Sequence, residues 1–136
     1  MANYQIEDIE GIGEVTGKKF RDAGVKDTDG LLAASTTPSA RARLAEATGL
    51  SATQVLKFAN MADLYRIHGV GSDYAQLLEA AGVDTVPALA RRAPANLAAA
   101  LAQVNEEKKL TRRVPPEADI VKWVEQAKGL PRVLEY

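Results

Sequence analysis

Two short glycine patterns contain the residues of this sequence that are best suited to bind an anion. Each pattern is a glycine, an apolar residue and a second glycine. They are Gly11-Ile12-Gly13, which we call hairpin one, and, 58 residues later, Gly69-Val70-Gly71, which we call hairpin two. Because glycine tolerates a positive φ, each pattern predicts a tight reversal of the chain. The second glycine should open a helix whose first N–H groups lack an intrahelical partner, which makes each turn a candidate phosphate site.

The residues after the two hairpins also repeat at nearly the same spacing. We expect a helix, a Gly-Val exit and a second helix that begins near a threonine in both copies, which predicts an internal duplication. Ile12 and Val70 should point into the core and hold each turn in place. The matching residues are Phe20 and Leu78, Ala23 and Ala81, Gly24-Val25 and Gly82-Val83, Thr28 and Thr85, and Leu31 and Leu89.

Hairpin one and its exit resemble a known motif. Residues 11–20, followed by Ala23-Gly24-Val25, resemble a helix-hairpin-helix motif of the kind found in the DNA polymerase beta family and in tandem helix-hairpin-helix domains. The whole chain resembles a small bacterial family of unknown function built from two such units, over most of residues 4–128. In the wider family the hairpin amides contact DNA backbone phosphate without reading sequence. The resemblance implies a non-catalytic nucleic-acid-binding module of weak, sequence-independent affinity.

The charged neighbours of the hairpins favour hairpin one as the better phosphate site. Lys18 and Lys19 follow hairpin one, whereas no lysine follows hairpin two before Glu79. Glu14 and Asp73 oppose anion binding, because each puts a carboxylate into the first turn of its helix.

A separate group of basic residues lies in the second half of the chain and consists of Lys108, Lys109, Arg112 and Arg113. It could supply phosphate contacts, each adding about 0.9 to the salt dependence of binding, or it could bind an acidic protein surface. Other basic residues, Arg41 with Arg43 and Arg91 with Arg92, are expected on solvated faces. The complete set of candidate nucleic-acid-binding residues is Gly11, Ile12, Gly13, Lys18, Lys19, Gly69, Val70, Gly71, Lys108, Lys109, Arg112 and Arg113.

Composition limits the classes of function. The net charge of −1 argues against a strongly electrostatic nucleic-acid binder. The alternative is a protein–protein interaction or scaffolding module that has lost phosphate binding, which an exposed apolar patch around Trp123 and the C-terminal tail would favour.

The chain has no cysteine and one histidine, His68, so it lacks a thiolate site and a histidine metal cluster. Val15 and Asp73 occupy the positions where helix-hairpin-helix glycosylases carry a lysine. We therefore expect neither a cofactor nor an enzyme.

The apolar periodicity predicts an all-α fold, with two tandem helix-hairpin-helix repeats packed as one compact domain. The repeats are residues 1–60 and 61–136, which share a helix near 52–67 and need no flexible linker.

No apolar run approaches the roughly 18–20 residues of a membrane span, and the N-terminus lacks signal-peptide character, so the expected location is the cytoplasm. The tail at 132–136 should either dock or fray. The expected helices cover 3–9, 14–23, a segment from 28, 38–48, 52–67, 72–81, 85–92, 94–105, 106–110 and a last helix ending at 128.

Overall fold

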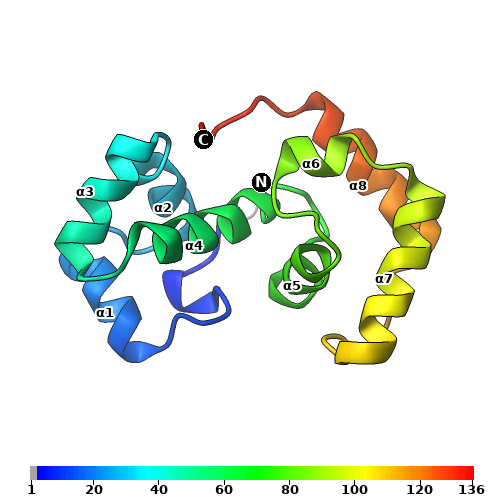
Figure 1. Ribbon diagram of the computed structural model, residues 1–136, viewed down its shortest axis with the longest axis horizontal. Coiled ribbons are helices and arrows are strands. Elements are labelled where there is room, and N and C mark those ends of the chain that lie inside the picture. Colours follow the sequence, from blue (N-terminus) through cyan, green and yellow to red (C-terminus); the bar gives the residue numbers. More distant parts are fainter. Residues whose placement is uncertain (1–2) are drawn as a thin grey trace.

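The computed structural model describes residues 3–136 and is all-helical over that range, as predicted (Figure 1). Within the described residues, the pairing of extended backbone is limited to one isolated bridge between Gln5 and Asp27. The elements are the 3₁₀ turn η1 (Ile6–Asp8) and the helices α1 (Glu14–Asp22), α2 (Thr28–Ala34), α3 (Pro38–Thr48), α4 (Ala52–Leu64), α5 (Ser72–Ala80), α6 (Val86–Ala90), α7 (Pro94–Lys108) and α8 (Glu117–Gly129).

Helix α4 connects two groups of helices (Figure 1). It packs against α2 and α3 in the first group and against α5 in the second, while α6 and α7 both pack against α8. Val55, Ala59 and Leu64 of α4 are fully buried. Because α4 gives apolar side chains to both groups, one hydrophobic core runs through the molecule.

Capping side chains explain where four of the helices begin. Asp27, Thr37, Ser51 and Thr85 each accept a hydrogen bond from the backbone N–H three residues further on, at the starts of α2, α3, α4 and α6. Such a cap satisfies one of the donors that a helix start leaves open. Ser51 and Gln54 form a complete capping box, with both of its hydrogen bonds present. Asp27 and Thr85 are 58 residues apart, and both cap the start of the second helix after their hairpin. The predicted match of Thr85 with Thr28 is therefore wrong by one position.

The N-terminal segment does not form the predicted helix over residues 3–9. Only η1 is helical, because the neighbouring backbone bonds to another segment instead. The Ile6 N–H donates to the carbonyl of Lys26 at 3.0 Å, and the Thr28 N–H donates to the carbonyl of Tyr4 at 2.9 Å. These bonds use backbone groups that a helix would have paired internally.

Helix α7 continues past Asn105, where the sequence predicted a stop and a separate piece over 106–110. It ends when Lys109 adopts a left-handed conformation with a φ of +52°. This conformation is uncommon outside glycine. The Asn105 side chain does not break the helix, because it bonds to Thr111 beyond the helix end.

A buried ion pair links α4 to two later segments. Arg66 Nη1 lies 2.8 Å from Asp63 Oδ1, and the side chains are only 6% and 2% exposed. The other Asp63 oxygen accepts a hydrogen bond from the Val86 N–H at 2.8 Å, while Arg66 Nη2 donates to the Pro131 carbonyl at 2.6 Å. Each buried charge therefore has a second partner, as the removal of a charge from water requires.

The C-terminal tail docks. It leaves α8 and crosses to the connection between α2 and α3 (Figure 1), where the Glu135 N–H donates to the carbonyl of Thr36 at 2.8 Å. Leu134 is buried there. Arg41 donates to the carbonyls of Ser35 and Glu135, at 2.8 and 2.7 Å. The expectation that Arg41 is solvated is therefore wrong, since it is only 5% exposed and holds the tail.

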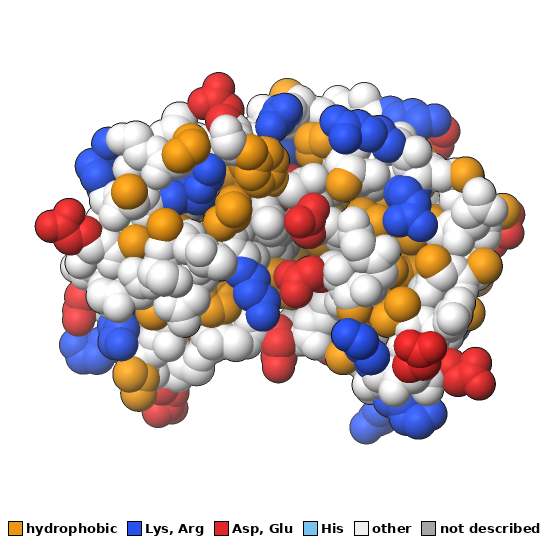
Figure 2. Space-filling model, viewed as in Figure 1, with side chains coloured by type: hydrophobic (Ala, Val, Ile, Leu, Met, Phe, Trp, Pro, Cys, Tyr) orange, Lys and Arg blue, Asp and Glu red, His pale blue; other side chains and the backbone are white. Residues whose placement is uncertain are grey.

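The surface carries charges of both signs. On the face shown in Figure 2, Lys and Arg side chains are interspersed with Asp and Glu over both groups of helices. Because the two signs are mixed, attraction of a polyanion would depend on local clusters of basic residues and not on the charge of the whole protein.

Within residues 3–136, no helix combines the length and the apolar character that crossing a membrane requires.

Candidate nucleic-acid interface

The two hairpins have nearly identical backbone conformations. The φ of Gly11 is +92° and that of Gly69 is +96°. Gly13 has φ −93° and ψ −164°, and Gly71 has φ −101° and ψ −165°. The positive φ explains why the first position of each pattern is glycine.

The apolar residue in the middle of each hairpin points into the core, as predicted. Ile12 is 4% exposed and Val70 is 1% exposed. Their N–H groups donate to the carbonyls of Ile9 and Ile67, at 3.0 and 3.1 Å, which closes each turn. These two candidate residues therefore anchor the hairpins and can offer a ligand only their backbone.

An aromatic ring packs over the first glycine of each hairpin. A Cβ atom added at Gly11 would lie 3.2 Å from a ring carbon of Phe58, and one at Gly69 would lie 3.0 Å from the indole nitrogen of Trp123. Trp123 is thus buried against hairpin two and forms no exposed apolar patch, whereas Tyr136 in the tail is exposed.

Both hairpins lead into helices that start without a side-chain cap. Gly13 precedes α1 and Gly71 precedes α5, and neither can supply the side-chain acceptor that begins the four capped helices. The N–H groups of the first helical residues, Glu14 and Ser72, have no acceptor within the described chain. Each hairpin therefore presents open donors at the positive end of a helix dipole.

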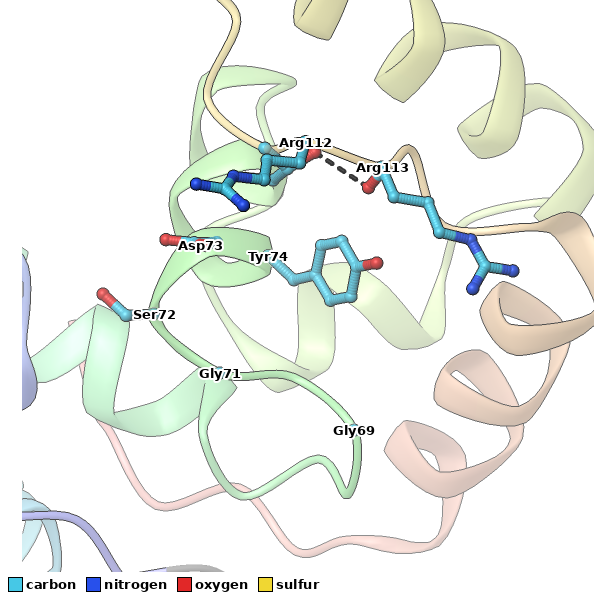
Figure 3. Close-up of a pocket in the computed structure, with 8 residues that line it drawn as sticks. Gly69, Gly71, Ser72, Asp73, Tyr74, Arg112 and Arg113 are labelled. Atoms are coloured by element: carbon cyan, nitrogen blue, oxygen red, sulfur yellow. Dashed lines mark hydrogen bonds between the residues drawn. The ribbon is translucent and has the colours of Figure 1, made fainter.

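The loop between α7 and α8 brings two arginines to hairpin two (Figure 3). Arg112 lies on the same side as Asp73, whereas Arg113 points the other way, toward α8, and the Tyr74 ring lies between them. The sequence ranks hairpin two as the poorer site because no lysine follows it, yet two arginines and one carboxylate line the hollow here. The hollow they share has a volume of about 580 Å³ and is lined by Gly69, Gly71, Ser72, Asp73, Tyr74, Thr111, Arg112 and Arg113.

Two side-chain amides hold this site in shape. Asn105 accepts from the Thr111 N–H at 2.9 Å and donates to the Thr111 carbonyl at 3.1 Å. The Thr111 hydroxyl in turn donates to the carbonyl of Arg113 at 2.9 Å. Gln126 does the same for hairpin two, because it accepts from the His68 N–H at 2.8 Å and donates to the His68 carbonyl at 3.2 Å.

Hairpin one borders a second hollow, of about 360 Å³, in which the charges balance. Lys57 of α4 and Lys108 of α7 line it together with Glu10 and Glu79, beside Gly11. Two lysines and two carboxylates in one hollow give no net attraction for phosphate.

The candidate lysines near hairpin one lie on the exposed surface of α1. Lys18 forms an ion pair with Asp22 at 2.9 Å, and Lys19 is exposed. The predicted basic group at the end of α7 does not form one cluster, because Lys108 lines one hollow, Arg112 with Arg113 line the other, and Lys109 lines neither.

An ion pair fixes the residues before hairpin one to α1. Arg21 donates two hydrogen bonds to the Glu7 carboxylate, at 2.6 and 2.9 Å. The Arg21 guanidinium lowers the pKa of Glu7 from its ordinary 4.5 to about 2. The Glu7 side chain also packs directly over Gly17, where a larger residue would displace it.

Sequence reasoning missed several residues of the two hollows. Lys57 has no signal in the local sequence, since it lies on the exposed face of an ordinary helix and is far in sequence from the residues of hairpin one. Tyr74 lies at a helical position that does not distinguish a lining residue from a core residue, and it is half-buried. Gln126 bonds to the backbone of His68, 58 residues away, which no local pattern reveals, and Asn105 bonds to Thr111 just beyond the end of its own helix. Within residues 3–136, no group of three His, Cys, Asp or Glu side chains could hold a metal ion.

Residues 10–130 match the family described as "Domain of unknown function (DUF4332)". Comparisons with curated proteins and with solved structures gave no match.

Proposed function

The chain belongs to the DUF4332 family, and we propose that it is a non-catalytic nucleic-acid-binding module that contacts backbone phosphate without reading sequence. Hairpin two is the primary contact in this proposal, with Arg112 and Arg113 as the charged groups. Hairpin one is a weaker second contact in this proposal, through its open backbone N–H groups and the exposed Lys18 and Lys19 of α1, because the hollow lined by Lys108 has balanced charges.

The observation that carries the proposal is the shared hollow at hairpin two. Arg112 and Arg113 come from the α7–α8 loop, yet they line the same concave surface as Gly69, Gly71 and Ser72. Guanidinium groups and open backbone N–H groups are the donors that commonly contact nucleic-acid phosphate. A lone helix start would be weaker support, because Asp73 sits in its first turn and repels an anion.

The matching hairpin geometry supports reading the chain as two helix-hairpin-helix repeats. Both turns combine a positive-φ glycine, a buried apolar residue and an extended glycine before an uncapped helix. The exits match as well, since the Val25 and Val83 N–H groups donate to the carbonyls of Phe20 and Leu78, each at 2.8 Å.

Fluorescence anisotropy with labelled DNA in a salt series tests the proposal. Wild type should bind at about 20–50 mM salt and weaken as salt rises, because phosphate contacts release counterions. The double variant Arg112→Glu/Arg113→Glu should lose at least about tenfold in affinity, and the salt slope should fall by about 1.4–1.8. Lys18→Glu/Lys19→Glu should have a smaller effect.

The matched control is Arg91→Glu/Arg92→Glu, which makes the same change of charge at the end of α6, away from both hollows. An equal loss in this control would mean that total charge, and not the site, governs binding. If wild type binds neither single- nor double-stranded DNA at low salt, the proposal fails. The balanced charges at hairpin one would then favour a scaffolding module, whose protein partner a pull-down would identify.

A further inference from the structure

Tyr74 is the only aromatic residue among those that line the hollow at hairpin two. Its ring lies between Arg112 and Arg113 (Figure 3). Trp123 supports the ring from the protein side, with ring centroids 5.3 Å apart and a tilt of 53°. Tyr74 is half-buried and lines the hollow, so part of its side chain is accessible.

The hairpin itself does not require an aromatic residue at this position. Thr16 stands at the matching position after hairpin one, where the backbone is nearly the same. The two arginines do not use the Tyr74 ring either, because the cation–π contacts found within residues 3–136 both involve Tyr136. Packing on Trp123 accounts for one side of the ring, whereas neither the hairpin nor the two arginines account for an aromatic residue that lines the hollow.

We propose that the nucleic acid bound at this hollow is single-stranded, with an unpaired base stacked on Tyr74 and flanking phosphates on Arg112 and Arg113. This inference rests on the proposed function. An aromatic ring beside basic groups is the arrangement that binds single strands without sequence preference, because every base has a face that can stack. The bases of a duplex stack on one another and are not free to cover the ring.

Three labelled probes test the inference: an oligothymidylate of about 12 nucleotides, an abasic strand of the same length, and a duplex of the same length. Wild type should bind oligothymidylate about tenfold more tightly than the abasic strand, because stacking adds to the phosphate contacts. Tyr74→Leu should lower oligothymidylate binding to the abasic level without changing the salt slope. Tyr74→Phe keeps the ring and should bind as wild type does.

Tyr4→Leu is the control, because Tyr4 is also half-buried and packs on another aromatic ring, that of Tyr65, but does not line the hollow. If Tyr74→Leu still prefers oligothymidylate to the abasic strand, the inference is wrong. Equal binding of all three probes by wild type would keep phosphate binding and overturn stacking, whereas binding of none would overturn both proposals. If Tyr74→Leu does not fold, the wild-type comparison of the thymidylate and abasic strands decides.

Discussion

Asn105 and Thr111 are joined by two hydrogen bonds across the end of α7. The side-chain amide of Asn105 pairs with both backbone groups of Thr111, at 2.9 and 3.1 Å. Because Thr111 then bonds to the carbonyl of Arg113, this one side chain orders the loop that carries both arginines of the hollow. A flexible loop would have to lose conformational freedom on binding, and an ordered loop does not.

Replacing Asn105 should therefore weaken nucleic-acid binding without removing a direct contact. We expect Asn105→Ala to lower the affinity for DNA about fivefold and the free energy of unfolding by about 1–2 kcal/mol, from the loss of two hydrogen bonds. Anisotropy and urea unfolding measure the two effects. Asn96→Ala, at an exposed position of the same helix, should change neither quantity by much. Unchanged affinity in Asn105→Ala would show that loop order does not contribute to binding.

Gly69 and Gly71 should respond differently to the same substitution. Gly69→Ala places a Cβ 3.0 Å from the Trp123 indole in a backbone with φ +96°, so we expect the free energy of unfolding to fall by about 1–3 kcal/mol. Gly71 has φ −101° and nothing within 4 Å of an added Cβ, so Gly71→Ala should stay within about 0.5 kcal/mol of wild type. Urea unfolding of both variants makes the comparison. Equal losses would contradict the assigned role of the positive φ.

The ion pair of Glu7 with Arg21 predicts a dependence of stability on acid. Since the folded-state pKa of Glu7 lies near 2 and the ordinary value is 4.5, the folded state holds this proton less tightly than the unfolded state. The contribution is therefore complete above about pH 4.5 and is lost as the pH falls from 4.5 toward 2. Glu7→Gln should be less stable than wild type at pH 7, and the two should converge at pH 2. Urea midpoints measured across this range test the prediction, and a constant difference would refute it.

The buried pair of Asp63 and Arg66 predicts a large loss when one partner is removed. Asp63→Ala leaves the Arg66 guanidinium buried without its counter-ion, and we expect a loss of about 3–5 kcal/mol in the free energy of unfolding. The double variant Asp63→Ala/Arg66→Met removes both charges and should lose less than the sum of the losses in Asp63→Ala and Arg66→Met. Thermal and urea unfolding measure all three. Additive losses would mean that the two charges do not interact.

Local signals in the sequence were enough to predict the all-α fold and most helix boundaries. Thr37, Ser51 and Gly49 mark helix ends through bonds to residues within one turn, so their effect is visible in the order of residues alone. The N-terminal exception arose where a distant segment competes for the same backbone groups. Tyr4 and Ile6 bond to residues 26–28 and so do not form the predicted N-terminal helix.

The candidate site was predictable only in part for the same reason. The glycines of both hairpins and the two arginines were identified, because their types alone suggest phosphate contacts. That Arg112 and Arg113 lie at hairpin two depends on how α7 and α8 pack, which no spacing between them and Gly71 indicates. Lys57 and Tyr74 carry no local signal that separates them from ordinary surface or core residues.

The docked tail has a consequence for how the protein forms during synthesis. The buried Arg41 donates a hydrogen bond to the carbonyl of Glu135, which lies 94 residues later in the chain. When only the first group of helices has been synthesised, the Glu135 carbonyl that accepts from Arg41 is not yet present, and neither is the buried Leu134. The first group of helices can therefore complete its packing only after residues 134 and 135 have been synthesised.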